Sequence, residues 1–194
     1  MISNTKQEIV LASTSPRRHM LLKQVNIPFK FLSPDAHEAM PASDDFGKIV
    51  CSNALDKAKS VSHLAEGRLI LGADTLVEFE GAPLGKPRDK DDAFKMLNLL
   101  SGQEHRVYTG IALVNSTTGE TFTEFVKTSV IFRELEKNEI AEYIQSGEPM
   151  DKAGSYGIQA RGALFIQKID GCFFNVMGLP LSRLWILLHK AGWR

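Results

Sequence analysis

The sequence predicts an α/β protein in which helices flank a mixed β-sheet. Apolar runs typical of buried strands alternate with segments of helical periodicity, and the connections include both helical crossovers and short hairpin turns. Crossovers join parallel strands and hairpins join antiparallel ones, so one sheet with both kinds of pairing is expected. The 194 residues are enough for one domain, and we expect a single domain over 1–194.

The N-terminal segment predicts a strand, a helix and a second strand. Ile9–Ala12 is a continuous apolar run, which predicts a buried strand, and Phe29–Leu32 alternates like another one. Between them, Ser15 suits the N-cap of a helix and Pro16 suits its first position. A strand–helix–strand unit is therefore expected at the start of the chain.

The middle of the chain begins with a long helix, expected over residues 44–66. Gly67 suits its end, and its apolar stripe consists of Val50, Ala54, Ala58, Val61 and Ala65. A buried strand is expected over 69–71, then a break at 72–75 and a further strand over 76–79.

The second half of the chain alternates between helices and hairpins. Thr121–Phe132 shows the two-residue alternation of a half-buried strand, and Pro180 precedes an apolar helix. In order, we expect a helix over 89–100, strands over 107–114 and 121–132 around a turn at 116–119, a helix over 136–145, a hairpin with strands over 163–169 and 172–176, and a helix over 181–189.

The charges of the chain balance, with 23 Lys and Arg against 23 Asp and Glu. A broad nucleic-acid surface needs a basic excess, so that class is disfavoured and any phosphate-binding charge must be local. Cys51 and Cys172 share no ligand spacing with other Cys or His, which predicts two reduced thiols and no structural zinc site. With a polar N-terminus and no run of about 18 apolar residues, we expect a cytoplasmic protein with no membrane partner.

Residues 13–18, Ser-Thr-Ser-Pro-Arg-Arg, leave a predicted strand and enter a predicted helix. Free backbone N–H groups at a helix start, together with hydroxyl and guanidinium groups, are the donors that a phosphate requires. Ser13, Ser15, Arg17 and Arg18 are therefore candidate phosphate ligands. The glycines of a Walker A loop are missing, and alone the segment is more typical of an ordinary helix cap with two solvated arginines.

Acidic and basic candidates follow in the next segments. Asp74 comes after an apolar strand, where a carboxylate is expensive to bury without a partner, so it is a candidate metal ligand or base as well as an ordinary turn residue. Lys57 lies beside the apolar stripe of the long helix, and Lys86 sits in a stiff Gly-Lys-Pro loop. Glu38 shares a loop with Asp35, where a second acidic group would help to hold a divalent cation. Alone, the lysines and the acidic loop are more typical of solvated surface.

The loop 148–159 combines glycines, charges and an aromatic residue, a composition common at binding rims. Its Gln159 could read the edge of a base, and Glu148 and Asp151 could orient the lysines. A plain connection is the more common alternative for such a loop. The five histidines fall in no triad or metal pattern, so Ser-His-Asp chemistry is not predicted.

In their order along the chain, these segments closely resemble the Maf family of nucleotide pyrophosphatases. The resemblance runs from about Ile9 to the C-terminal helix and rests on an ordered set of motifs: 12–18 (ASTSPRR), 72–75 (GADT), 85–87 (GKP), 101–102 (SG), 108–110 (YTG), 152–154 (KAG), 156–159 (YGIQ) and 178–180 (GLP). It implies a fold like that of the inosine triphosphate pyrophosphatases, an elongated mixed sheet with helices around it and a central cleft between two lobes. It also implies hydrolysis between the α and β phosphates with a divalent metal ion, Mg²⁺ or Mn²⁺.

The resemblance also assigns roles to single residues. Asp74 matches the catalytic acidic residue, and Asp74 and Glu38 are the implied metal ligands. The implied phosphate-binding residues are Ser13, Ser15, Arg18, Lys57 and Lys86. Three selectivity positions of the dTTP/UTP pyrophosphatase branch are matched by Arg17, Thr75 and Gln159. A homodimer is expected by family likeness only.

The resemblance therefore implies a pyrophosphatase that hydrolyses dTTP and UTP, and modified pyrimidine nucleotides, to the monophosphate and pyrophosphate. One alternative is the branch that prefers 7-methyl-GTP, which carries an aromatic residue, Gln and Glu at the three selectivity positions. A Gln amide can both donate to and accept from uracil or thymine, whereas a Glu would accept from guanine. Two further alternatives are a nucleotide-binding regulator of cell division without turnover and a non-nucleotide phosphatase that would release orthophosphate.

Overall fold

The computed structural model describes residues 7–39 and 45–194, so the expected helix start at residue 44 lies outside the described residues. The strands are β1 (Ile9–Ala12), β2 (Phe29–Leu32), β3 (Leu69–Phe79), β4 (Ala82–Leu84), β5 (Glu104–Asn115), β6 (Thr121–Phe132) and β7 (Ile166–Asp170). The α-helices are α1 (Pro16–Gln24), α2 (Phe46–Ser60), α3 (Lys90–Leu100), α4 (Lys137–Gln145), α5 (Phe173–Val176) and α6 (Leu181–Lys190). Short 3₁₀ turns are η1 (Ser62–Leu64), η2 (Glu148–Asp151), η3 (Ala153–Ser155) and η4 (Ala160–Phe165).

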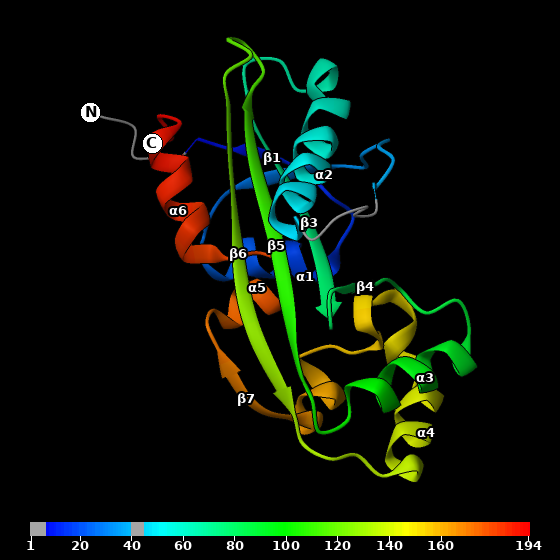
Figure 1. The fold of residues 1–194 in the computed structure, drawn as a ribbon. Coiled ribbons are helices and arrows are strands. Elements are labelled where there is room, and N and C mark those ends of the chain that lie inside the picture. The colour runs from blue at the N-terminus through cyan, green and yellow to red at the C-terminus, as the bar shows by residue number, and fades with distance from the viewer. Residues whose placement is uncertain (1–6, 40–44) are drawn as a thin grey trace.

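The strands form one sheet in the order β2-β1-β3-β5-β6-β7, with β4 paired to β3. β1 pairs parallel with β2 and β3, and the other pairs are antiparallel. The expected mixed sheet is therefore confirmed. The long strands β5 and β6 run the length of the molecule, with α1, α2 and α6 around one end and α3 and α4 at the other (Figure 1). We call these ends the first and second lobe.

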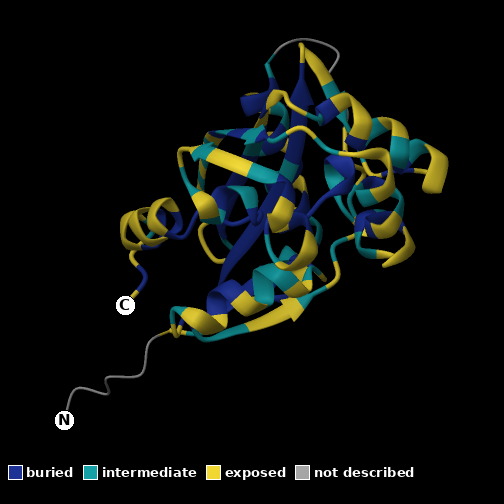
Figure 2. Cartoon of the chain, turned by 90° about the horizontal axis from the view of Figure 1, so that it is seen from below, coloured by how far each residue is buried: buried dark blue, intermediate teal, exposed yellow. Residues whose placement is uncertain are grey.

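The core is divided between the faces of the sheet and the two lobes. In the first lobe, Leu11 and Leu71 pack with α1 and α6 on one face, whereas Val10 and Ile70 pack with α2 on the other. This is the alternation that a strand imposes on its side chains. In the second lobe, a separate apolar cluster around Phe132 holds α3 and α4. Figure 2 shows the central strands buried and the outer helix surfaces exposed.

The expectation of two strands separated by a break at 72–75 is wrong, because β3 is one strand of 11 residues. The Gly72 position is not a turn but a contact point for α2. A Cβ on Gly72 would stand 1.9 Å from the carbonyl oxygen of Ala54, and a Cβ on Gly110 of β5 would stand 2.3 Å from the backbone of Val50. Glycines on two neighbouring strands thus let α2 lie directly on the sheet.

The helix expected over 44–66 ends earlier than predicted, at Ser60. The hydroxyl of Ser60 donates to the carbonyl of Lys57 at 2.9 Å, and the hydroxyl of Ser62 donates to the carbonyl of Lys59 at 2.8 Å. Serine side chains that bond nearby backbone groups compete with helix continuation. The chain accordingly passes into the 3₁₀ turn η1.

The hairpin expected at 163–169 and 172–176 is also wrong. The partner of β7 is β6, and the segment after it forms the short helix α5. The amide of Asn175 donates to the carbonyl of Val107 and to the hydroxyl of Thr128, both at 2.9 Å. These bonds hold the segment against β5 and β6, so it does not pair with β7.

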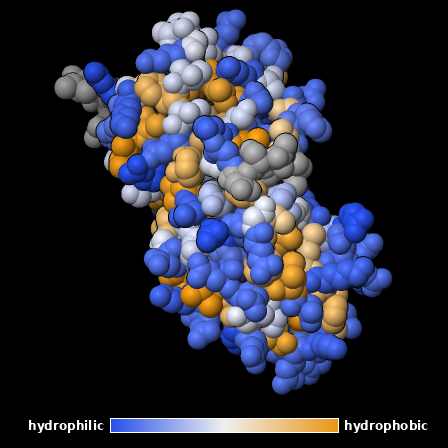
Figure 3. Space-filling model, in the orientation of Figure 1, coloured by the Kyte–Doolittle hydropathy of each residue, from blue (hydrophilic) through white to orange (hydrophobic). Residues whose placement is uncertain are grey.

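The remaining surface features are ordinary. Cys51 and Cys172 are free thiols, as predicted, and both are half-buried; burial raises the pKa of Cys51 to about 11. On the face in Figure 3, hydrophilic side chains predominate, with small apolar patches between them. Within 7–39 and 45–194, no helix is long and apolar enough to cross a membrane.

Candidate active site

A cleft of about 330 Å³ opens beside β3. β1 pairs with β3 only as far as Gly72, and β4 pairs with it from Val77 onward. Between them, residues 73–76 have no strand on that side in the described part of the chain. Past Ala12 the chain turns away into α1, so the cleft lies at the carboxyl end of a parallel strand, where ligand sites of α/β sheets commonly form.

The structure brings all ten predicted site residues to this cleft. They are Ser13, Ser15, Arg17, Arg18, Glu38, Lys57, Asp74, Thr75, Lys86 and Gln159. Asp35, the neighbour of Glu38 in the acidic loop, is not among the lining residues. With Lys152 and Asp151, the lining carries five cationic and three carboxylate side chains, which gives local positive charge in a chain without net charge.

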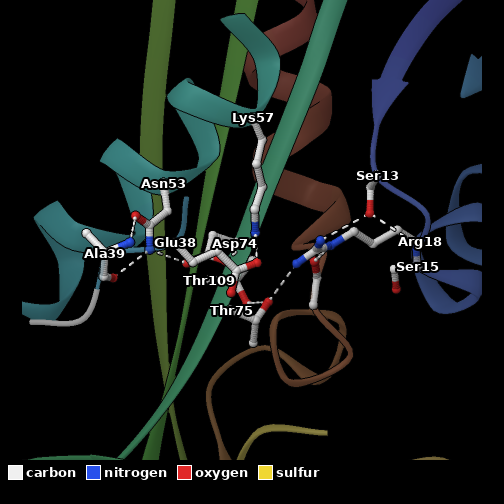
Figure 4. Close-up of polar contacts among 11 residues, drawn as sticks. Ser13, Ser15, Arg18, Glu38, Ala39, Asn53, Lys57, Asp74, Thr75 and Thr109 are labelled. Atoms are coloured by element: carbon white, nitrogen blue, oxygen red, sulfur yellow. Dashed lines mark hydrogen bonds and ion pairs between the residues drawn. The ribbon is translucent and has the colours of Figure 1, made fainter. Parts of the chain in front are cut away.

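Asp74 is the centre of a polar group that we call the Asp74 cluster, which consists of the buried residues Asp74, Lys57 and Asn53 and the exposed Glu38 (Figure 4). The Nζ of Lys57 lies 2.6 Å from Oδ1 of Asp74 and 2.6 Å from Oε1 of Glu38. Asn53 donates Nδ2 to Oδ2 of Asp74 at 2.9 Å. Asp74 is therefore a mid-strand carboxylate with a partner on each oxygen and a side chain only 9% exposed, not an exposed turn residue.

The close approach of α2 to the sheet explains why this cluster forms. Asn53 and Lys57 are one helical turn apart, so both project from the same face of α2. Gly72, two residues before Asp74, and Gly110, opposite Asp74 in register, bring that face onto the strand. The carboxylate expected to be costly to bury thus receives two donors from one helix.

The loop that carries Glu38 is tied to the same helix. The side chain of Asn53 accepts from the backbone N–H of Ala39 and donates to its carbonyl, both at 3.0 Å. Burial raises the pKa of Glu38, but the hydrogen bond and charge of Lys57, with the charges of Lys86 and Arg18, outweigh it. The net shift is downward, so Glu38 is ionised at neutral pH.

The segment between β1 and α1 differs from a standard helix cap. Ser15 occupies the N-cap position of α1, but its side chain makes no capping hydrogen bond, contrary to expectation. Instead, Oγ of Ser13 accepts from the backbone N–H of Ser15 at 3.2 Å and from Nη1 of Arg18 at 3.3 Å. The backbone N–H groups in the first turn of α1 are thus not capped by the side chain of Ser15, which leaves them available to an anion.

Arg18 is held on three acceptors. Besides Ser13, it donates Nε to the carbonyl of Gly178 at 2.9 Å and Nη2 to Oγ1 of Thr75 at 3.1 Å. Burial lowers its pKa and the charge of Asp74 raises it, with a net downward shift, yet a guanidinium stays charged in proteins. Two of its five N–H groups remain for a ligand.

Across the cleft, Arg17, Asp151 and Lys152 form what we call the Asp151 rim. Oδ2 of Asp151 lies 3.2 Å from Nη1 of Arg17, and its Oδ1 lies 2.6 Å from Nζ of Lys152. Burial raises the pKa of Asp151, but the bonds and charges of Lys152 and Arg17 lower it further, so it is ionised. Asp151 thus pairs with Lys152, and its predicted role in orienting Lys57 and Lys86 stays a prediction.

The other loop residues have different surroundings. The carboxylate of Glu148 accepts from the hydroxyl of Tyr143 at 3.0 Å and from two backbone N–H groups of η4 at 3.3 Å. It therefore fastens the loop instead of orienting a lysine, although its carbonyl accepts from Lys152 at 2.6 Å. Nε2 of Gln159 makes a long contact of 4.0 Å with the sulfur of Met20.

Sequence reasoning missed the residues that stand behind Arg18 and Thr75. Thr109 and Gly178 appeared only within motifs of the resemblance, and Asn175 was placed in a strand. All three join the hydrogen bonds that surround Arg18. In the sequence, each of them is at most a single small or polar residue within an apolar segment. A single residue makes no periodic pattern that could be recognised.

The fold and the cleft define an α/β protein with a positively charged cleft at the end of a parallel strand. A family model described as Maf-like protein matches residues 8–191. The chain belongs to the Maf family, and the resemblance inferred from the sequence is confirmed.

Several relatives carry the name dTTP/UTP pyrophosphatase. One from Clostridium botulinum (strain Kyoto / Type A2) is 43% identical over 190 residues, which cover 96% of this chain and 98% of that protein. One from Bacillus cereus (strain G9842) is 46% identical over 178 residues, 92% of each chain. The solved structure of the Staphylococcus aureus Ham1 protein is 16% identical, with a TM-score of 0.46 over 65% of this chain and 72% of that one.

Proposed function

We propose that this protein is a nucleoside triphosphate pyrophosphatase that hydrolyses dTTP and UTP to the monophosphate and pyrophosphate. The observation that supports it most is the convergence of the ten site residues on one positively charged cleft, in a family with relatives of that name. In the reaction, water adds to the α-phosphorus, the bond to the bridging oxygen breaks, and pyrophosphate leaves. The positive charges around the cleft offset the charge that builds on the leaving group.

The Asp74 cluster supplies the groups for the attack. Each oxygen of Asp74 accepts one bond, so each keeps a lone pair that can take the proton of the attacking water. The ammonium of Lys57 uses two of its three N–H groups on Asp74 and Glu38, and the third remains for a phosphate oxygen. Arg18 contributes its two remaining N–H groups in the same way.

The two carboxylates of the cluster fit a divalent cation, Mg²⁺ or Mn²⁺. Oxygens of Glu38 and Asp74 both lie 2.6 Å from the ammonium of Lys57, so the two carboxylates are neighbours and could share one ion beside Lys57 through the lone pairs that it leaves free. Among the residues that the structure describes, no three Asp, Glu, His or Cys side chains gather into a cage. Two carboxylates suit an ion that keeps waters and phosphate oxygens as its other ligands, and such an ion would neutralise phosphate charge.

The selectivity assigned to Arg17, Thr75 and Gln159 is part of the proposal. All three line the cleft, from α1, β3 and the start of η4. The amide of Gln159 can both donate and accept, which suits the edge of uracil or thymine.

The test is a panel of dTTP, UTP, CTP, GTP and 7-methyl-GTP with Mg²⁺, in which pyrophosphate, orthophosphate and monophosphate are measured separately. We expect pyrophosphate from dTTP and UTP. Pyrophosphate mainly from 7-methyl-GTP would keep the reaction but refute the selectivity. Orthophosphate would refute the cleavage position, and tight binding without product would favour a regulator.

A further inference from the structure

A line of hydrogen bonds leads from Arg18 at the cleft into the core. Nη2 of Arg18 donates to Oγ1 of Thr75 at 3.1 Å, and that oxygen lies 3.0 Å from Oγ1 of Thr109. Thr109 in turn donates to the backbone carbonyl of Asn175 at 2.8 Å. Thr109 and Asn175 are fully buried, with 0% exposure. We call these four residues the hydroxyl chain (Figure 4 shows its outer part).

The carbonyl at the inner end fixes the direction of every hydrogen in the chain. A carbonyl only accepts, so the single hydroxyl hydrogen of Thr109 is used on Asn175. The hydrogen between the two threonines must then come from Thr75. Thr75 is left with lone pairs only, which it offers to the guanidinium of Arg18. All three bonds therefore run one way, from the cleft to the core.

The backbone of the 175–178 turn closes this chain into a ring. The carbonyl of Asn175 also accepts from the N–H of Gly178 at 2.9 Å, and the carbonyl of Gly178 accepts from Nε of Arg18 at 2.9 Å. Gly178 has φ +98°, and a Cβ there would stand 3.2 Å from Oγ1 of Thr75. Arg18 is thus held at two of its nitrogens by one continuous structure.

The side chain of Asn175 locks that turn in place. Its Nδ2 donates to the carbonyl of Val107, which can only accept, so the amide cannot be reversed. Its Nδ2 also donates to Oγ1 of Thr128 at 2.9 Å. These two bonds hold the side chain of Asn175, and with it the 175–178 turn, in one position.

We propose that Thr109 is a positioning residue that acts through Thr75 on Arg18, an inference that rests on the proposed function. The chain keeps the guanidinium in one orientation, with its two remaining N–H groups ready for phosphate oxygens. It also means that Thr75 never donates its hydrogen to the substrate, since that hydrogen is used on Thr109. Thr75 therefore contributes to substrate choice through Arg18 and not as a donor to the base.

Thr109→Val tests the chain at nearly constant volume. Without the hydroxyl of Thr109, the hydrogen of Thr75 has no fixed acceptor. The Thr75 hydroxyl can then rotate, so it no longer holds a lone pair toward Arg18. We expect kcat for dTTP to fall on the order of tenfold with KM changed less than about threefold, because a displaced group costs most in the transition state. Thr109→Ser, which keeps the hydroxyl, should restore kcat to within about twofold of the wild type.

Ser116→Ala is the control for the loss of a hydroxyl group. The hydroxyl of Ser116 donates to the carbonyl of Ala65 at 2.7 Å and accepts from the N–H of Arg68 at 3.0 Å, and none of these residues lines the cleft. Its removal leaves both backbone groups without this side-chain partner. We expect Ser116→Ala to lower Tm, yet to keep kcat within about twofold of the wild type.

The outcomes separate the inference from the proposed function. Equal loss of kcat in Thr109→Val and Ser116→Ala, or no rescue by Thr109→Ser, would overturn the positioning role alone. If Thr109→Val does not fold, Thr75→Val and Thr75→Ser test the neighbouring hydroxyl. We then expect kcat to fall in Thr75→Val and to be restored in Thr75→Ser. A wild-type protein that forms no pyrophosphate from dTTP or UTP would overturn both.

Discussion

In the Asp74 cluster one cation lies between two carboxylates, whereas in the Asp151 rim one carboxylate lies between two cations. The cluster is built on α2, β3 and the loop after β2; the side chains of Lys57 and Asp74 are each 9% exposed, and that of Glu38 is 58% exposed. The rim is built on the start of α1 and the turn η2 with the residue after it; the side chain of Asp151 is 62% exposed and that of Lys152 is 14% exposed. The central charge is thus buried in the cluster, where it is Lys57, and exposed in the rim, where it is Asp151.

This difference in burial and support separates two tasks. Buried charges on regular elements interact strongly and hold their positions, which proton transfer and charge stabilisation require. An exposed ion pair contributes about 0–1 kcal/mol, so Arg17 can exchange Asp151 for a phosphate at little cost. We therefore propose that the Lys57–Asp74 pair carries the chemistry and that the rim provides adjustable binding.

Asp74→Asn should give the largest effect. An amide cannot take the proton of the attacking water, and its NH₂ group would face the donor of Lys57 or Asn53. We expect kcat for dTTP to fall roughly 10³-fold. Folding should persist because Glu38 still pairs with Lys57. Pyrophosphate release and Tm check this, and retained turnover would remove Asp74 from the catalytic role.

Gly72→Ala tests whether the cluster depends on the close approach of α2. The new Cβ would meet the carbonyl oxygen of Ala54 at 1.9 Å, so the helix must shift and carry Lys57 away from Asp74. We expect a loss of about 3 kcal/mol in the free energy of unfolding, together with a fall in kcat. Gly85→Ala is the control, since nothing lies within 4 Å of its Cβ. Similar urea unfolding curves for both variants would contradict this account.

A buried histidine should make the second lobe acid-sensitive. Nε2 of His105 lies 2.7 Å from the hydroxyl of Tyr156, a residue of the cleft lining, and burial lowers its pKa from 6.5 to about 4. The stabilising contribution of neutral His105 is complete above pH 6.5. It is lost as the pH falls toward 4, because in this range the histidine is protonated in the unfolded chain but not in the folded one. The loss is at most about 1.4 kcal/mol per pH unit, or about 3 kcal/mol in all.

Urea unfolding as a function of pH measures this loss. His105→Gln should flatten the profile between about pH 6.5 and 4, whereas His63→Gln, at an exposed position, should leave it unchanged. An unchanged profile in His105→Gln would show that another group causes the acid sensitivity.

Asp151→Asn should give the smallest effect. The ion pair is exposed, so the free energy of unfolding should change by less than about 0.5 kcal/mol. Because Arg17 loses a competitor for phosphate, KM for dTTP should fall by about twofold at low salt, and the difference should shrink at high salt. Titrations of dTTP at two ionic strengths measure it. A loss of kcat as large as that of Asp74→Asn would place the rim in the chemistry.

The elements that could be predicted each carry their own pattern. β1 is a buried apolar run, β6 alternates, and α6 follows Pro180, so their local sequence is sufficient. The elements that were missed depend on contacts with distant residues. Gly72 and Asp74 are poor strand residues, and only α2 above them explains why β3 continues. Likewise, α5 forms because Asn175 bonds strands far away in the sequence.

For the site, the residues could be named from ordered motifs that resemble a family, since each motif alone left an ordinary surface role open. What could not be seen is which groups face each other. The distance from Lys57 to Asp74 depends on two glycines, and the direction of the hydrogen between Thr75 and Thr109 depends on a buried carbonyl. The residue roles, the homodimer, the single domain over 1–194 and the cytoplasmic location stay predictions.

The open stretch of β3 at residues 73–76 has a consequence for solubility. An unpaired strand edge is usually a place where a second polypeptide adds on and aggregation begins. Here the stretch is bounded by β1 on one side and β4 on the other, and charged side chains surround it. A visiting strand would need several more residues in register than this gap provides. The gap is thus too short to pair with a second strand, which removes the usual hazard of an open edge.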